Sequence, residues 1–287
     1  MQYLRASDAA EAVRHLADAG GKGYVLAGGT DLLVQMKSRR IDPGLVVDIK
    51  ALPGTMEIVR DGGGYRIGAG VPGAALGEDA DFVADWPGVA EAAQLIGSTQ
   101  IQGRATMVGN LCNASPAADT VPALMAADAV ALIEGPDGQR KVKVADIPAG
   151  PGKTTLKVGE FVLAVLLPER PALASDAYLR FIPRTEMDIA VASAAVSLTL
   201  DEDGTVTAAR VALGAVAAMA YLDAKAAERL VGTKLEDDVL ADVAQICAAS
   251  CSPIDDKRGT VAYRREVVGV LAKRAARLAY ARAKERT

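Results

Sequence analysis

The stretch Val25-Leu26-Ala27-Gly28-Gly29-Thr30-Asp31-Leu32-Leu33 places an apolar run, two glycines and the start of an amphipathic helix in direct succession. This order predicts a buried strand over residues 24–27, a tight turn, and a helix whose apolar face includes Met36. Glycine lets a backbone or a phosphate approach where a Cβ would stand, and a helix start offers unpaired N–H groups to an anion. The stretch also fits an ordinary turn with Thr30 as N-cap. Asp31 is expected to cap the helix while facing away from any phosphate.

A second glycine-containing stretch carries an unusual density of polar side chains. It reads Ala105-Thr106-Met107-Val108-Gly109-Asn110-Leu111-Cys112-Asn113-Ala114-Ser115-Pro116-Ala117-Ala118-Asp119-Thr120. Such a cluster is costly to bury unless its members bond to one another or to a ligand. Pro116 and Pro122 fix the chain on either side, and a helix is expected to start near Thr120. A loop held only by its own side-chain hydrogen bonds accounts for the stretch equally well.

Length and composition limit the class of protein. The chain has 287 residues, enough for two domains, and its net charge of −4 argues against an overall nucleic-acid footprint. The sequence contains no apolar run of the roughly 18 residues that span a bilayer. Its first residues lack the apolar core of a signal peptide, so we expect a cytoplasmic protein.

The cysteine and histidine content limits the chemistry. Cys112, Cys247 and Cys251 are too few for the four thiolates of a typical iron–sulfur cluster. Because His15 is the single histidine, a histidine-based triad and a multi-histidine metal site are excluded within one chain. No residue is therefore assigned to acid–base catalysis or to a metal.

Turn signals divide the chain into an α+β succession. Residues 1–53 read as helix, strand, helix and strand, and Asp61-Gly62-Gly63-Gly64 predicts a hairpin between residues 56–60 and 65–69. Residues 71–148 contain two helical stretches, the polar segment and a strand. Further strands and helices are expected over residues 161–167, 189–200, 206–216, 221–231, 236–250 and 259–284.

The two glycine-containing stretches resemble the paired FAD-binding loops of the flavoprotein subunit of molybdenum hydroxylases, the xanthine dehydrogenase and aerobic carbon monoxide dehydrogenase family. The first loop of that family runs A-G-G-T/H-x-L/I, which matches residues 27–32. The second runs T-I-G-G-N-L-x-x-x-x-P-x-x-D, which matches residues 106–111 together with Pro116 and Asp119.

Further matches follow in order along almost the whole chain. Residues 159–162 resemble the strand before the domain junction, residues 178–190 the Y-x-K/R-x…R-x-x-x-D-I-A segment, and residues 257–265 the R-G-S-A-x-Y-R-R start of the last helix. The resemblance implies an α+β fold with a two-part FAD-binding domain of the PCMH type over residues 1–170, with subdomains of about 1–53 and 54–170. A C-terminal domain of the carbon monoxide dehydrogenase flavoprotein type, an antiparallel sheet with a helical bundle, follows over residues 171–287.

The resemblance also assigns residues to an FAD site. Asp119 would accept a hydrogen bond from the cofactor, Val162 would contact the isoalloxazine region through its backbone, and Arg180 takes the place of a lysine near that ring. Ile96 aligns with a position that packs on the cofactor, although an ordinary core position explains it equally well. The pyrophosphate and ribityl parts would be held by Val25, Leu26, Ala27, Gly28, Gly29, Thr30, Asp31, Leu32, Thr106, Met107, Val108, Gly109 and Asn110.

The implied partners are the other subunits of such an enzyme. In the family a large molybdopterin-binding subunit oxidises the substrate, and electrons cross the clusters of a small [2Fe-2S] subunit to FAD. The flavin then passes them to NAD, a quinone, oxygen or another acceptor. The resemblance implies a dimer of heterotrimers, with no nucleic acid and no membrane span, and leaves the substrate to another polypeptide.

One residue departs from the family pattern. Val108 stands where the family commonly has the first of two glycines. A β-branched residue tolerates a positive φ badly, so we expect Val108 to remain extended or the turn to shift slightly.

Two other functions stay open at this point. A self-sufficient FAD-dependent oxidoreductase with the same cofactor-binding fold would need substrate-side acids or a histidine attachment point. A scaffold without a cofactor would leave the polar segment at 106–120 unexplained.

Overall fold

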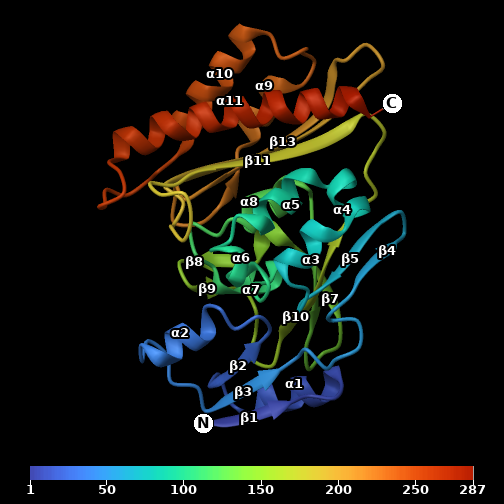
Figure 1. Ribbon diagram of the computed structural model, residues 1–287, viewed down its shortest axis with the longest axis vertical. Coiled ribbons are helices and arrows are strands. Elements are labelled where there is room, and N and C mark those ends of the chain that lie inside the picture. Colours follow the sequence, from blue (N-terminus) through green and yellow to red (C-terminus); the bar gives the residue numbers. More distant parts are fainter. Residues whose placement is uncertain (287) are drawn as a thin grey trace.

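The computed structural model describes residues 1–286, so Thr287, the last residue of the predicted C-terminal domain, lies outside it. Three tiers follow one another along the long axis of the molecule (Figure 1). A small sheet from the N-terminus lies at one end, a five-stranded sheet with short helices lies in the middle, and a third sheet covered by a long helix lies at the other end. The predicted α+β class with two domains is confirmed.

The first tier is a parallel three-stranded sheet of order β1-β3-β2. Its strands are β1 (Gln2–Arg5), β2 (Gly23–Leu26) and β3 (Leu45–Asp48), with α1 (Ala9–Asp18) and α2 (Leu32–Lys37) between them. Helix α1 starts at Asp8, whose carboxylate accepts a hydrogen bond from the Glu11 amide at 2.8 Å. Strand β1 was not predicted, because most of its residues are exposed and it carries no apolar run.

The second tier is an antiparallel five-stranded sheet of order β4-β5-β10-β6-β7. The predicted hairpin is confirmed as β4 (Ile58–Asp61) and β5 (Gly64–Gly68), which pair antiparallel. Strand β10 (Phe161–Leu167) lies in the middle of the sheet and is almost entirely buried. The remaining strands are β6 (Val130–Glu134), β7 (Arg140–Lys143) and a separate short pair, β8 (Pro148–Gly150) and β9 (Lys153–Thr154).

Six short helices pack with this sheet, where only two helical stretches were expected. Glycines, prolines and capping residues separate these helices, so no single long periodic pattern marks them in the sequence. They are α3 (Gly73–Glu78), α4 (Ala80–Asp85), α5 (Pro87–Gln94), α6 (Thr99–Gln102), α7 (Met107–Asn113) and α8 (Thr120–Ala126).

The third tier is an antiparallel sheet of order β11-β12-β13-β14. Helices α5 and α8 contact it from the middle tier, and α11 (Val261–Glu285) packs on it from the C-terminal part, as Figure 1 shows. Strands β12 (Ala192–Leu200) and β13 (Val206–Gly214) are shorter than predicted. Strand β11 (Ala174–Phe181) was not predicted, and the expected helix at 221–231 divides into β14 (Tyr221–Leu222) and α9 (Ala224–Leu230). The remaining helix, α10 (Asp237–Ser250), agrees closely with the sequence.

The end of α11 ties the third tier to the second. Arg282 donates to the carboxylate of Glu91 on α5 and to the backbone carbonyl of Asp176 on β11. Arg286 pairs with Asp85 at 2.9 Å. The position of β11 over α5 is therefore fixed by charged side chains as well as by apolar packing. No helix within residues 1–286 has both the length and the apolar character needed to cross a membrane.

Candidate cofactor site

The two glycine-containing segments meet in the structure. A Cβ at Gly28 would stand 1.9 Å from the carbonyl oxygen of Arg104, so any side chain there would collide with backbone. A second contact joins the helices that follow, because Gln35 of α2 donates to the side-chain oxygen of Asn113 of α7 at 2.9 Å. Residues that are far apart in the sequence thus form one surface, and the close approach explains why position 28 is a glycine.

The first segment turns sharply after β2 and enters α2 through its backbone. Gly29 has φ +80°, and its carbonyl accepts a hydrogen bond from the Leu33 amide at 3.1 Å. The prediction of Thr30 as N-cap is wrong, because the N-cap position is Asp31. Within residues 1–286 the Asp31 side chain makes no capping hydrogen bond, so that expectation also fails. The backbone turn itself forms the first helical hydrogen bond, so neither the Thr30 nor the Asp31 side chain caps the helix.

Lys50, which was not predicted, binds the backbone just after β2. Lys50 Nζ donates to the carbonyl of Ala27 at 3.1 Å and pairs with Asp48 at 2.8 Å. Tyr3 donates to the other carboxylate oxygen of Asp48 at 2.8 Å. Burial raises the pKa of Asp48, but hydrogen bonds from Lys50 and Tyr3 outweigh it and hold the pKa below its usual range. Val25 and Leu26 are half-buried in this strand.

The second segment is a helix over residues 107–113 and continues as turns and irregular backbone to the start of α8. Thr106 is the N-cap of α7, and its hydroxyl accepts a hydrogen bond from the Gly109 amide at 2.9 Å. Met107 and Val108 are buried in the first turn of this helix. The expectation that Val108 stays extended is therefore wrong, and its helical conformation removes the conflict between a β-branched residue and a positive φ.

Asn110 links α7 to the start of α8. Its side-chain oxygen accepts hydrogen bonds from the amide of Thr120 at 3.0 Å and from the Thr120 hydroxyl at 2.7 Å. Helix α8 begins at Thr120, as predicted, and Asp119 occupies its N-cap position. The Asn110 and Thr120 side chains thus satisfy each other, whereas Asn113 is bound by Gln35 of α2.

Asp119 is buried and bound by two residues of β11. Tyr178 Oη donates to one carboxylate oxygen at 2.8 Å, and Arg180 Nη1 donates to the other at 2.7 Å. Burial raises the pKa of Asp119, against the opposing effect of Arg180 and the two hydrogen bonds. Arg180 Nε is buried and has no hydrogen-bond partner among the described residues. A buried N–H without a partner is costly, and it marks a place where a ligand atom would be favourable.

The last two predicted residues lie in β10 and just after α5. Val162 is buried in β10, where the pairing with β6 shifts register between Val162 and Ala164, so its backbone lies at an irregular point of the sheet. Ile96 is half-buried just after α5. The next residue, Gly97, has φ +64° and accepts a hydrogen bond from the Met187 amide at 3.3 Å. The segment after β11 therefore reaches the position of Ile96.

Comparison with known proteins shows the family to which the chain belongs. Residues 1–170 match the FAD binding domain in molybdopterin dehydrogenase, and residues 177–279 match the CO dehydrogenase flavoprotein C-terminal domain. The chain belongs to this family of FAD-binding subunits. The carbon monoxide dehydrogenase medium chain of Afipia carboxidovorans is 34% identical over 98% of this chain and 97% of its own.

Two further relatives agree. A putative xanthine dehydrogenase FAD-binding subunit of Escherichia coli is 29% identical over 95% of this chain and 93% of its own. A solved structure of carbon monoxide dehydrogenase from Oligotropha carboxidovorans superposes with a TM-score of 0.94 at 31% identity, covering 98% of both chains. The cofactor of this FAD-binding subunit is FAD.

The residues that the two segments present fit such a cofactor. Gly28 keeps a Cβ away from the place where the segments meet, whereas a Cβ at Gly29 would press on Leu26 of its own segment. A Cβ at Gly109 would stand 2.9 Å from the Thr106 hydroxyl. In the first turn of α7 the Gly109 amide binds the Thr106 hydroxyl, but the amides of Met107 and Val108 have no carbonyl within the helix to bind, so they suit an anionic group. The buried Nε of Arg180 offers one more donor.

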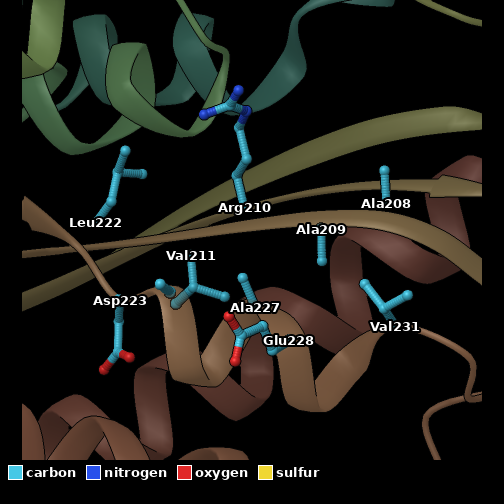
Figure 2. Close-up of a pocket in the computed structure, with 10 residues that line it drawn as sticks. Ala208, Ala209, Arg210, Val211, Leu222, Asp223, Ala227, Glu228 and Val231 are labelled. Atoms are coloured by element: carbon cyan, nitrogen blue, oxygen red, sulfur yellow. The ribbon is translucent and has the colours of Figure 1, made fainter.

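A separate groove of about 410 Å³ lies elsewhere, along β13 and α9 (Figure 2). Figure 2 shows Arg210 pointing toward the helices of the middle tier, while Glu228 and Val231 lie on the side of α9. Of the described residues that line it, none belongs to the predicted cofactor site. The groove is therefore a different region from the predicted FAD site at the two segments.

Three contributors to this site were not predicted. Lys50 and the Arg104 carbonyl touch the first segment from elsewhere in the chain, and no motif marks either of them. Tyr178 belongs to a matched segment but received no role. Its position two residues before Arg180 was the available signal, since alternate residues of a strand share one face.

Proposed function

We propose that this chain is the electron-transfer subunit of a heteromeric molybdenum hydroxylase. Its FAD would take electrons from a [2Fe-2S] subunit and pass them to an external acceptor, because the redox chemistry belongs to the cofactor and the protein positions it. The observation that carries the proposal is the contact between the two glycine-containing segments at Gly28 and Arg104, in a chain whose relatives are medium chains and FAD-binding subunits.

Each part of the site has a proposed task. The backbone of residues 25–32 and 106–110 holds the pyrophosphate and ribityl parts from two sides. Val162 contacts the isoalloxazine region through its backbone and Ile96 packs on the cofactor. Asp119 accepts a hydrogen bond from the cofactor, and Arg180 lies near the ring. This division is supported by Gly28 at the meeting point and by the buried donor on Arg180.

The proposed partners are a large molybdopterin-binding subunit and a small [2Fe-2S] subunit, arranged as a dimer of heterotrimers. The acceptor would be NAD, a quinone, oxygen or another oxidant. We also propose a cytoplasmic location, supported by three cysteines that form no disulfide within residues 1–286. The proposed domain boundaries are 1–170 and 171–287, with a division of the first near residue 53, supported by the change of sheet after β10 and after β3.

Purification of the full chain alone and with its partners tests the proposal. The lone chain should contain FAD, should be reduced by a strong artificial donor, and should fail to oxidise the substrate of the assembled enzyme with a dye as acceptor. The complex should co-purify a molybdopterin-containing chain and a chain that holds iron–sulfur clusters. Sustained turnover by the lone chain at the rate of the complex would instead establish a self-sufficient flavoenzyme.

A further inference from the structure

Tyr178, Asp119 and Arg180 form a buried chain of hydrogen bonds. Tyr178 is 1% exposed, and the side chains of Arg180 and Asp119 are 5% and 10% exposed. The tyrosine hydroxyl and the guanidinium each donate to a different oxygen of the same carboxylate, at 2.8 and 2.7 Å. Both partners of Asp119 therefore come from one strand of the other domain.

Strand geometry explains this arrangement. Tyr178 and Arg180 are two residues apart on β11, so their side chains leave the same face of the sheet. That face meets α8, whose N-cap position is Asp119. The carboxylate thus holds Arg180 in place, and the tyrosine holds the carboxylate in place.

Arg180 has donor capacity left after this pairing. Its Nε is buried, and no described residue accepts a hydrogen bond from it. A guanidinium carries five N–H donors, and a buried one without a partner costs free energy. Arg180 is also connected to the cofactor segments, because Thr120, next to Asp119, donates twice to Asn110 of α7. The spare donor therefore lies beside the second segment.

We propose that Tyr178 and Asp119 are positioning residues that fix Arg180 as a rigid cation facing the flavin. The inference rests on the proposed function. Reduction adds negative charge to the cofactor, and a cation that is already oriented in a buried site stabilises that charge without reorganising. Asp119 then affects the reduction potential of the flavin by holding Arg180, and Tyr178 affects it by holding Asp119.

The flavin potential separates this role from a merely structural one. The potential measures how much more tightly the protein binds reduced than oxidised FAD. A structural defect weakens both forms alike and leaves the potential unchanged, whereas a displaced cation weakens the reduced form more. A tenfold change in this ratio corresponds to about 30 mV for a two-electron couple.

The test is a redox titration of the FAD-loaded full chain against a reference dye, in the wild type and in Tyr178→Phe. This change removes only the hydroxyl that binds Asp119. We expect a threefold to tenfold loss of preference for reduced FAD, which lowers the potential by about 15 to 30 mV. Tyr280→Phe is the matched control, because it removes a hydroxyl that donates to the Gly204 carbonyl at 2.7 Å in the C-terminal domain. It should leave the potential unchanged.

A second pair of variants tests the cation itself. Arg180→Met should lower the potential by more than Tyr178→Phe does, and Arg180→Lys should recover part of the difference because it restores the charge. If Arg180→Met fails to fold, the comparison of Arg180→Lys with Tyr178→Phe remains. A wild-type potential in Tyr178→Phe, with FAD bound stoichiometrically, overturns this inference alone. A wild-type chain that binds no FAD overturns the proposed function with it.

Discussion

The two segments of the proposed cofactor site differ in the groups that hold their shape. The first, residues 25–32, shapes its turn with backbone and is half-buried or exposed throughout. The second, residues 106–120, is largely buried and is held by side chains, with Asn110 and Asp119 each accepting two hydrogen bonds. A backbone-built segment depends on the absence of Cβ atoms, whereas a side-chain network depends on every partner being present. Substitutions in the first segment should therefore act through added Cβ atoms, and substitutions in the second through lost hydrogen-bond partners.

The largest effect should come from breaking the network of the second segment. Asp119→Ala leaves the Arg180 guanidinium buried and unpaired, and loss of one partner of a buried ion pair costs about 3–5 kcal/mol. We expect this loss in the free energy of unfolding of the FAD-free chain, measured with urea. FAD affinity should fall as well.

An exposed ion pair provides the control for that measurement. Asp237 pairs with Arg277 at 2.5 Å, but its side chain is 88% exposed. Asp237→Ala should cost less than about 1 kcal/mol, because water screens the charges. Equal costs at positions 119 and 237 would contradict the account of the buried network.

The first segment should respond most strongly at Gly28. Gly28→Ala forces the Arg104 carbonyl away, and strain of this kind costs about 1–3 kcal/mol. Because the shift separates the two segments, FAD affinity should fall by more than about tenfold, a loss above 1.4 kcal/mol in binding. Equilibrium titration followed by flavin fluorescence measures it.

Gly103 is the matched control, since it lies next to Arg104 in the sequence. A Cβ there would have only an ordinary contact of 3.7 Å with the Gln100 carbonyl. Gly103→Ala should keep wild-type FAD affinity. If Gly28→Ala also keeps it, the meeting point of the segments is not part of the site.

A smaller effect is expected at Gly29, where the backbone conformation is the main restriction and a Cβ would also stand 2.9 Å from the flexible end of the Leu26 side chain. Its φ of +80° costs an ordinary residue about 1–2 kcal/mol. Asparagine adopts this conformation more readily, so Gly29→Asn should be milder than Gly29→Ala in urea unfolding. Equal effects of the two substitutions would show that φ is not the restriction.

The smallest effect is expected at Cys112, whose alkylation rate can be measured without disturbing the fold. Burial raises the pKa of the Cys112 thiol in the second segment from an ordinary 9.0 to about 12. At pH 8 its thiolate fraction is then about a thousandfold lower than in the unfolded chain. Alkylation of Cys112 should be slow in the native protein, should speed up as the pH is raised, and should become fast in urea. Rapid alkylation at pH 8 without urea would show that the second segment is open.

The sequence predicted those features that glycines, turns and long apolar runs encode. The strand before Gly28, the hairpin around Gly62, the start of α8 at Thr120 and the helix α11 all follow from local signals. Val108 was misjudged because the family motif suggested a turn, while the structure begins a helix at that point.

Other features depend on contacts between distant residues. Strand β1 is recognisable only beside β3, and β11 only against β12. In the site, Lys50 and Tyr178 act on Ala27 and Asp119, and neither pair is adjacent in the sequence. The glycine turn of the first segment was therefore more predictable than the side-chain network of the second, because a restricted backbone requires glycine whereas a hydrogen-bond network uses ordinary polar residues.

Amide hydrogen exchange of the full chain, with and without FAD, tests most directly whether the cofactor lies between the two segments. The account predicts that FAD slows exchange in both residues 27–33 and residues 106–111, while exchange along β13 and α9, which line the separate groove, stays the same. Protection confined to β13 and α9, or to only one of the two segments, would contradict it.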